Sequence, residues 1–454
     1  MAHFDSSALF SLYRQLAPAE LFRLLQLQMG LKVRGGIYNS RLVMWMMMIQ
    51  RLQPRGTLAS SVTQLVEGRF DPLLSQCKRV QEKRIGVSTG GYCQARQHLP
   101  KLLVSLSMDE LIERLRGRLL ESGPELAQRV YLLDGSSLQL EHELEFLQAF
   151  PPASNQHGKS HWPVMRIVVL HDLETGLAER PYWGPLNGRK AVSEQALAER
   201  AIAHVPAGSV IIGDRNFGIF ATAYSTQQAG HKAIVRLTAV RAKRLMGGPI
   251  ACQGDYPVCW SASRWDGRKK GRKKGRPQAP PWPPDACIEG RLIARQVGRG
   301  KHKQWLYLFT TTSLPAEEVV ALYGRRWRIE TDLRCLKQTV NLQRLSAHSQ
   351  DMMEKELLVA VMAYNLVRAI MFLAARRAQI DPRQLSFTYA CNIVLDSYPE
   401  VLAARTAKQQ QEKLDWIIDL VARCRLPRRR KRRSYPREVW GRGYRFPVRR
   451  REKN

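Results

Sequence analysis

Three acidic residues stand where carboxylates could carry out chemistry. Asp134 interrupts the apolar run 130–133, Asp214 follows the apolar run 210–213, and Glu330 lies in a later segment with helical spacing. A carboxylate buried without a partner costs several kcal/mol, and converging carboxylates repel one another, so three that meet need a cation. Mg²⁺, with Mn²⁺ as a substitute, prefers carboxylate oxygens, and a pair of such ions about 4 Å apart supports phosphodiester chemistry. We therefore predict that these three acids are metal ligands and catalytic residues.

The segment around Glu330 predicts a helix with a cationic face. At about 3.6 residues per turn, Tyr323, Arg326, Glu330 and Lys337 fall within an arc of about 60°, so they project from one side. Asp332 falls about 200° from Glu330 on the same wheel and is predicted to lie outside the site. Apolar residues form the adjoining stripe, which predicts packing against the core. The members of this stripe are Leu322, Ile329, Leu333, Leu336 and Val340.

The overall charge of the chain favours a polyanionic partner. Lys and Arg number 72 against 39 Asp and Glu in 454 residues, a formal net charge of +33, which favours nucleic acid. The length predicts two or three domains and excludes a single small binding module. The longest apolar stretch, 357–375, carries Asn365 and Arg368, which predicts a packed helix and no membrane span.

The N-terminus and the cysteines bear on the compartment. The first residues do not have the pattern of a secretory signal peptide, which is a basic start, an apolar segment and a small-residue cleavage site. We therefore expect a cytoplasmic protein. The eight cysteines contain no Cys-x2-Cys pair. Their pattern predicts reduced structural thiols rather than a zinc knuckle.

The three acids must be positioned by a folded scaffold, and the order of strand and helix patterns along the chain predicts an α/β fold. Residues 1–128 have helical spacing and form the predicted N-terminal DNA-binding domain. The predicted catalytic core, 129–375, is a mixed sheet with helices on its faces, in the order β-β-β-α-β-α-β. A β-rich insertion at 238–312, with an exposed basic loop at 264–284, interrupts it, and 376–454 supplies C-terminal helices and a basic tail. The predicted strands are 130–140, 165–173, 177–183, 210–212 and 232–237, with a helix at 193–204 and a long helix from Pro315.

The motifs around the acids resemble those of the DDE transposases of bacterial insertion sequences. They are Asp134-Gly135-Ser136, the run Gly213-Asp214-Arg215-Asn216-Phe217, and Tyr-x2-Arg-x3-Glu-x6-Lys from Tyr323 to Lys337. The third motif is typical of one branch, the insertion sequence 4 family. The resemblance implies an RNase H-like core whose metal-binding triad is the three acids. It also implies phosphate contacts from the Tyr, Arg and Lys of the third motif, and we add Arg215 to the expected DNA contacts.

The same resemblance implies two finer features. Members with a β-rich insertion before the last helix cut DNA through a hairpin and stack a displaced base on an insertion tryptophan, which implies this role for Trp305. The run 268–277, RKKGRKKGRP, has no counterpart in that pattern. The tail, 425–450, mixes basic and aromatic residues, a composition suited to phosphate contacts and base stacking.

The function expected from these features is DNA transposition. Such a protein would cleave the ends of its element with Mg²⁺, free a 3′-hydroxyl and join it to target DNA, working as a homodimer without a covalent protein intermediate. Two alternatives stay open: a nuclease of the same fold without strand transfer, and a catalytically silent DNA-binding regulator. Each site residue also has a plainer interpretation. Asp134 could cap the turn at Gly135 and Asp214 the next helix. The Glu330 helix could present a solvated face with Glu330 in an i,i+4 salt bridge, and Trp305 could be a packed strand residue.

Overall fold

The computed structural model describes residues 36–427 together with residues 27 and 30, with gaps at 75–76, 83, 121–127, 156–157, 263–281, 284, 299–302 and 344. The predicted basic run at 268–277 lies outside the described residues, and so does the predicted basic tail beyond residue 427.

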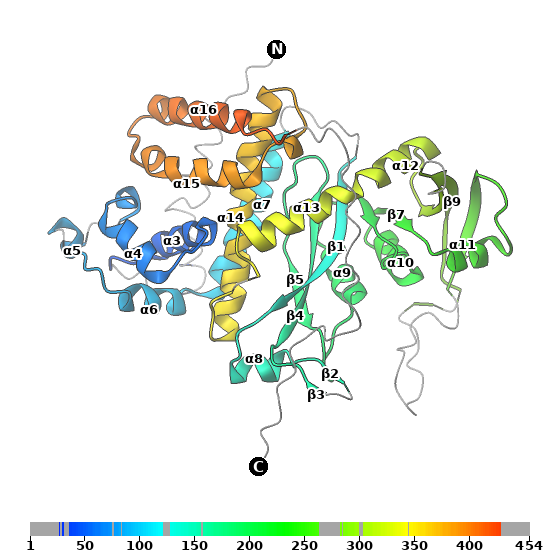
Figure 1. Ribbon diagram of the computed structural model, residues 1–454, viewed down its shortest axis with the longest axis horizontal. Helices are drawn as coiled ribbons and strands as arrows, with labels where there is room; N and C mark the ends of the chain where they lie inside the picture. Colours follow the sequence, from blue (N-terminus) through cyan, green and yellow to red (C-terminus); the bar gives the residue numbers. More distant parts are fainter. Residues whose placement is uncertain are drawn as a thin grey trace.

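A mixed sheet of eight strands forms the centre of the described structure (Figure 1). Its strands are β1 (Val130–Gln139), β4 (Val164–Asp172), β5 (Tyr182–Pro185), β6 (Val210–Gly213), β7 (Lys232–Arg236), β8 (Gly254–Ser261), β9 (Cys287–Val297) and β10 (Gln304–Thr310), and a separate pair is formed by β2 (Ser154–Asn155) and β3 (Gly158–Lys159). The strand order is β5-β4-β1-β6-β7-β10-β9-β8. β1, β6 and β7 are parallel neighbours, and all other neighbours are antiparallel. The predicted α/β class, a mixed sheet flanked by helices, is confirmed.

The two faces of β1 contact different layers because side chains alternate along a strand. Val130 and Leu132 belong to the large core that the sheet shares with the helices. Tyr131 and Leu133 belong to a second core, together with side chains of α9 (Glu194–Ile202). Asp134 therefore continues the row of Val130 and Leu132 on the first face.

The helices surround the sheet on both faces. α10 (Phe220–Gln228) is the crossover between the parallel strands β6 and β7. The others outside the Glu330 region are α3 (Ser40–Leu52), α4 (Leu58–Val66), α5 (Lys78–Gln81), α6 (Gly90–His98), α7 (Lys101–Leu120), α8 (Leu144–Ala149), α11 (Ala239–Met246), α14 (Gln350–Arg377), α15 (Phe387–Ala403) and α16 (Ala407–Arg423), with 3₁₀ turns at Asp71–Leu73 and Pro382–Gln384.

The central helix of the helical layer is α14. It packs against α3, α7, α15 and α16, and Figure 1 shows α7 and α3 beside it. Among the described residues it is the one helix long and apolar enough to cross a membrane, yet its most apolar window is completely buried inside the protein. The packed helix predicted at 357–375 is therefore confirmed.

The helix predicted from Pro315 is present but irregular. α12 (Ala316–Gly324) passes into a 3₁₀ turn, η3 (Arg325–Trp327), then into α13 (Arg328–Arg334) and a π-helical turn, η4 (Cys335–Thr339). In this last turn the amide of Val340 donates to the carbonyl of Cys335, five residues back, at 3.1 Å. The prediction of one regular α-helix is therefore wrong in detail, although its apolar stripe is buried as predicted.

Two other sequence predictions differ from the structure. The strand predicted at 177–183 is reduced to a single bridge at Ala178 before β5 begins at Tyr182. Pro181, between them, has no amide hydrogen to donate to a ladder. Cys259 and Cys287 form a disulfide between the paired strands β8 and β9, so the prediction of reduced thiols is wrong for this pair.

The strands of the predicted insertion extend the central sheet. β10 pairs directly with β7, and β9 and β8 continue outward from it. One core of buried side chains runs from Leu42 in α3 to Val421 in α16, and it crosses both predicted domain limits, at residues 128 and 375. The position of those limits stays a prediction.

A buried ion cluster joins the N-terminal helices to α14. Glu356 accepts from Arg51 at 2.9 Å and from Arg96 at 2.5 Å, and all three side chains are at least nine-tenths buried. We expect Glu356→Gln to lower the free energy of unfolding by about 3–5 kcal/mol, because it leaves two buried guanidinium groups without a counter-charge. Urea unfolding measures this. The control is Glu400→Gln, in an exposed pair with Lys413, for which we expect less than about 1 kcal/mol; equal effects would contradict the prediction.

Candidate active site

The strand register brings the first two predicted acids next to each other. β1 and β6 pair in parallel over residues 130–133 and 210–213, so Asp134 and Asp214 occupy the next position on each strand. Here β6 ends, whereas β1 continues against β4. The negative charge of Asp214 raises the pKa of Asp134, as expected for neighbouring carboxylates.

Asp134 is a half-buried carboxyl with a raised pKa. Burial is the largest cause, and the charges of Asp214 and Glu194 add to it. The Gly135 amide, which donates to Oδ1 of Asp134 at 2.8 Å, and the charge of Arg326 act in the opposite direction. The resulting pKa is about 6 instead of 3.8. A carboxylate that is costly to ionise in this place is one whose charge a cation would stabilise.

Asp214 begins a tight turn after β6. Its Oδ1 accepts the amide of Asn216 at 2.7 Å, and its carbonyl accepts the amide of Phe217 at 3.1 Å. Phe217 packs so closely against Gly213 that a Cβ atom on the glycine would lie 2.8 Å from the Cβ of Phe217. The glycine before the acid and the phenylalanine after it therefore fix the turn that presents Asp214.

The Glu330 helix is linked to the aspartates through Arg326. Arg326 is buried, its charge lowers the pKa of Asp134, and it pairs with Oε1 of Glu330 at 3.6 Å. Burial raises the pKa of Tyr323, the charge of Arg326 lowers it, and that of Asp214 raises it. α13 contacts β1, and Figure 1 shows it lying across the sheet beside this strand. The structure thus gathers Asp134, Asp214, Tyr323 and Arg326, with Glu330 attached through Arg326.

Lys337 lies on the same face of β1 as Asp134. Its Nζ donates to Oγ of Ser136 at 3.0 Å, and Ser136 shares the Asp134 face because side chains alternate along the strand. Burial lowers the pKa of Lys337. The contact from η4 to β1 therefore orients the cationic side of the helix toward the first acid.

The three acids do not form a closed metal site in this structure. Among the described residues, no group of three or more His, Cys, Asp or Glu side chains has the spacing to hold a metal ion. Glu330 is half exposed and paired with Arg326. The donor set nevertheless fits Mg²⁺, because carboxylate oxygens are its preferred ligands and, within the described part of the chain, no hydrogen bond reaches Oδ2 of Asp134 or Asp214. Glu330 would complete the set on leaving Arg326.

Asp332 lies apart from these acids. It is completely buried and bonds Arg368 at 2.5 Å and Arg383 at 2.7 Å. Burial raises its pKa, but the two guanidinium groups outweigh burial and keep the pKa below its ordinary value. The position of Asp332 on the helical wheel, about 200° from Glu330, correctly predicted this separation.

Glu194 and Trp327 are two neighbours of the site that we did not predict from the sequence. Glu194 raises the pKa of Asp134 and accepts a hydrogen bond from the side chain of Asn216. Trp327 is 63% exposed, and the Arg326 guanidinium lies 5.0 Å from the centroid of its ring. Glu194 could not be found from the sequence, because an acid in the first turn of a helix is common. Trp327 could have been found, because it lies inside the third motif.

Trp305 and Arg215 have the surroundings of ordinary surface and strand residues. Trp305 is partly buried in β10, where it packs on another core that includes Phe220 and Phe309, and its ring stacks on Tyr307 with centroids 5.8 Å apart. Arg215 is exposed directly after Asp214, and its carbonyl accepts from Arg241 at 3.2 Å. A role for either residue on DNA stays a prediction.

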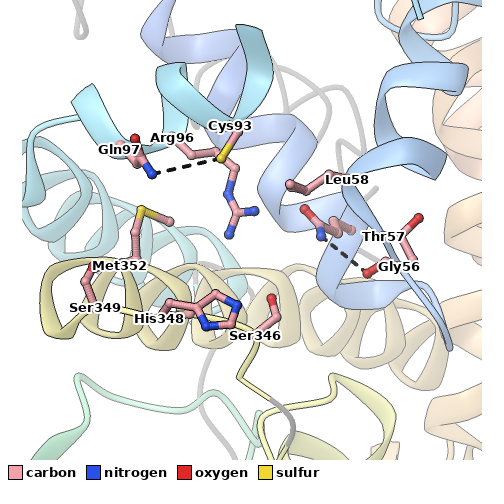
Figure 2. Close-up of a pocket in the computed structure, with 12 residues that line it drawn as sticks. Gly56, Thr57, Leu58, Cys93, Arg96, Gln97, Ser346, His348, Ser349 and Met352 are labelled. Atoms are coloured by element: carbon pink, nitrogen blue, oxygen red, sulfur yellow. Dashed lines mark hydrogen bonds between the residues drawn. The ribbon is translucent and has the colours of Figure 1, made fainter. Parts of the chain in front are cut away.

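A cavity of about 470 Å³ lies between the N-terminal helices and the start of α14 (Figure 2). Its walls come from residues 50–58, 93–97 and 346–352, and neither the three acids nor the cationic residues of their helix line it. Figure 2 shows the Arg96 guanidinium pointing toward its centre, and the buried carboxylate of Glu356, which does not line the cavity, pairs with that guanidinium. The cavity therefore lacks the carboxylate pair that phosphodiester chemistry needs.

The family model described as Transposase DDE domain matches residues 125–366, more than half of the chain and the whole span from Asp134 to Glu330. This chain belongs to the transposase DDE domain family. The predicted membership of the DDE transposases is thereby confirmed.

Two known proteins are similar to this transposase-family chain. Transposase InsG for insertion sequence element IS4, from Escherichia coli (strain K12), is 24% identical over 307 residues, which are 66% of this chain and 65% of that protein. The chain thus aligns with slightly less than two thirds of the length of this relative. The similarity to a transposase of element IS4 agrees with the predicted insertion sequence 4 branch. A cryo-EM structure of the piggyBac transposase synaptic complex with hairpin DNA has a TM-score of 0.40 at 12% identity, covering 88% of this chain and 77% of that chain.

Proposed function

We propose that this member of the family is a DNA transposase that cleaves the ends of its own element and joins them to target DNA. The observation that carries the proposal is the parallel register of β1 and β6, which sets Asp134 beside Asp214 under a helix that carries Glu330, Arg326 and Lys337. Acids with cationic neighbours are what phosphodiester cleavage and transfer require. Membership of the transposase DDE domain family supports the same class of reaction.

Asp134, Asp214 and Glu330 are proposed to hold Mg²⁺, or Mn²⁺ in its place. When bound, the metal would supply charge neutralisation and Lewis acidity at the scissile phosphate. Glu330 would leave Arg326 and turn toward the two aspartates, since its carboxylate is exposed and its present bond is long, at 3.6 Å. The Arg326 guanidinium would then be available to a phosphate oxygen.

The phosphates at the element's ends are proposed to contact Tyr323, Arg326 and Lys337, with Arg215 as a further contact. All four side chains carry hydrogen-bond donors, and the formal net charge of +33 favours association with DNA. The helices before residue 128 are proposed to recognise the end sequence. Trp305 is proposed to stack a displaced base if the second strand is cut through a hairpin.

The proposed reaction is a hydrolysis followed by a transesterification. Water attacks the phosphodiester at the element's end and releases a 3′-hydroxyl. This hydroxyl then attacks a phosphodiester of the target, so one P–O bond forms as another breaks. No bond to the protein forms, so no Ser or Tyr nucleophile is needed. Two ends must be held together, which requires at least a homodimer on the DNA, and the reaction is proposed to take place in the cytoplasm.

A strand-transfer assay tests this proposal. The DNA that flanks the gene supplies the ends, recognisable as short inverted repeats bordered by a direct duplication. Purified protein is incubated with labelled end DNA, a supercoiled plasmid and either Mg²⁺ or EDTA. We expect the label to be recovered in the plasmid with Mg²⁺ and not with EDTA. Cutting without joining would identify a nuclease, and metal-independent binding to intact strands a regulator; both results would contradict the proposal.

Lys337→Met is expected to weaken binding to end DNA and to flatten its salt dependence. Each phosphate contact contributes about 0.9 to the slope of log K against log salt concentration, so one lost contact should reduce the slope by about that amount. Fluorescence anisotropy over a series of KCl concentrations measures it. Lys337→Arg keeps the charge and serves as the control. An unchanged slope would mean that Lys337 serves only its bond to Ser136.

A further inference from the structure

Glu194 occupies the space that opens where β6 ends. The paired register of β1 and β6 stops at Gly213, so the turn that carries Asp214 continues beyond the ladder. Oε2 of Glu194 accepts a hydrogen bond from the Asn216 side chain. Oε1 lies so close to Gly135 that a Cβ atom built there would be 1.7 Å from it. One carboxylate therefore touches both the residue after Asp134 and the turn after Asp214.

The first turn of α9 holds this carboxylate in place. Ser193 caps the helix by accepting the amide of Ala196 at 3.1 Å, and Leu197 is buried against the sheet. Gln195 donates to both the carbonyl and the side-chain oxygen of Asn216, at 3.1 and 3.0 Å. Two consecutive side chains of α9 thus hold the residue that also donates its amide to Asp214.

We propose that Glu194 is a positioning residue that sets the spacing between Asp134 and Asp214 by filling the gap between Gly135 and Asn216. The inference rests on the proposed function, because the spacing matters only if the two aspartates share a cation. A Cβ atom at position 135 would lie 1.7 Å from Oε1 of Glu194, so a larger residue there must displace the Glu194 carboxylate.

The test compares Glu194→Ala with Glu194→Gln in the full-length protein without DNA. Mn²⁺ affinity is measured by titration calorimetry, and the order of the turn by hydrogen exchange at residues 215–218. We expect Glu194→Ala to weaken Mn²⁺ binding by about 10–100-fold and to speed exchange in the turn. Gln keeps the length and the acceptor oxygen, so it should remain close to the parent in both. Glu199→Ala, a half-buried acid on the same helix, is the matched control.

Gly135→Ala supplies an independent route to the same displacement. Alone it should weaken Mn²⁺ binding by a factor similar to that of Glu194→Ala, because its methyl group pushes the carboxylate away. Combined with Glu194→Ala it should cause no further loss, because the side chain it meets is gone. This suppression is the expected result, and additive losses would overturn the proposal.

Other outcomes are equally decisive. Equal losses for Glu194→Gln and Glu194→Ala would show that the charge, not the position, is what matters. Unchanged exchange at 215–218 in Glu194→Ala would remove the structural basis of the proposal. A parent protein that binds Mn²⁺ normally and responds to these variants as expected, yet joins no DNA, would count against the proposed function alone.

Discussion

Glu330→Gln is expected to reduce strand cleavage by about 10³-fold or more while leaving DNA affinity and stability close to those of the parent. The carboxylate is half exposed and its bond to Arg326 is 3.6 Å long, so removing its charge should change the free energy of unfolding by less than about 1 kcal/mol. Cleavage falls because a neutral amide is a poor substitute for a carboxylate at a Mg²⁺ site. Labelled end DNA, fluorescence anisotropy and urea unfolding measure the three quantities.

Asp332→Asn is the matched control, two residues farther along the same helix. Asp332 is completely buried between Arg368 and Arg383, so its neutralisation should lower the free energy of unfolding by about 3–5 kcal/mol. The folded fraction should still cleave at close to the parent rate. Arg383→Gln, which removes one of the two partners, gives a milder loss if Asp332→Asn does not fold. A reversed pattern, with Glu330→Gln unstable and Asp332→Asn inactive, would show that the Asp332 side of the helix, and not the Glu330 side, faces the site.

Asp134→Asn is expected to abolish cleavage and to make the metal-free protein more stable. The folded-state pKa of Asp134 is about 6, against 3.8 in the unfolded chain. The ionised carboxyl therefore opposes folding above about pH 6, and this opposition disappears as the pH falls below about 4. At about 1.36 kcal/mol per pKa unit, the gain from Asn at pH 8 is at most about 3 kcal/mol, and no gain is expected near pH 4.

The comparison requires urea unfolding of both proteins at several pH values in EDTA. Asparagine can still accept the Gly135 amide bond that Oδ1 accepts now, so the substitution isolates the charge. Mg²⁺ should raise the melting temperature of the parent and not that of Asp134→Asn, since a ligand stabilises the state that binds it. An Asp134→Asn protein that is less stable than the parent at pH 8, or that still responds to Mg²⁺, would show that Asp134 is not a metal ligand.

The scaffold of the site could be predicted because its signals are local. An apolar run followed by an acid predicts a buried strand that carries a carboxylate, and both runs form buried strands, with Asp214 directly after β6 and Asp134 within β1, which continues to Gln139. The wheel around Glu330 predicted the buried apolar stripe and the separation of Asp332 from Glu330, but not the burial of Tyr323 and Arg326 on the polar face. Both predictions need only the period of a strand or of a helix.

The remaining features depend on contacts between segments distant in sequence, which single-chain patterns do not encode. Glu194 meets Gly135 only because α9 folds back against the middle of β1. The pairing of Glu330 with Arg326 was foreseen as a plain alternative, but the sequence could not decide between this pair and a closed metal site. The disulfide of β8 and β9 likewise follows from strand pairing rather than from cysteine spacing.

The irregular winding of the helix between Pro315 and Thr339 makes Glu330 easier to move than the two aspartates of the sheet. Asp134 lies within β1 and is paired with Val169 of β4, and Asp214 directly follows β6, which pairs on both sides up to Gly213 in the middle of the eight-stranded sheet. Glu330 lies between a 3₁₀ turn and a π-helical turn, and rewinding either turn would rotate its side chain. Adjustment to substrate is therefore expected to come from the helix, with the two aspartates serving as the fixed reference against which it moves.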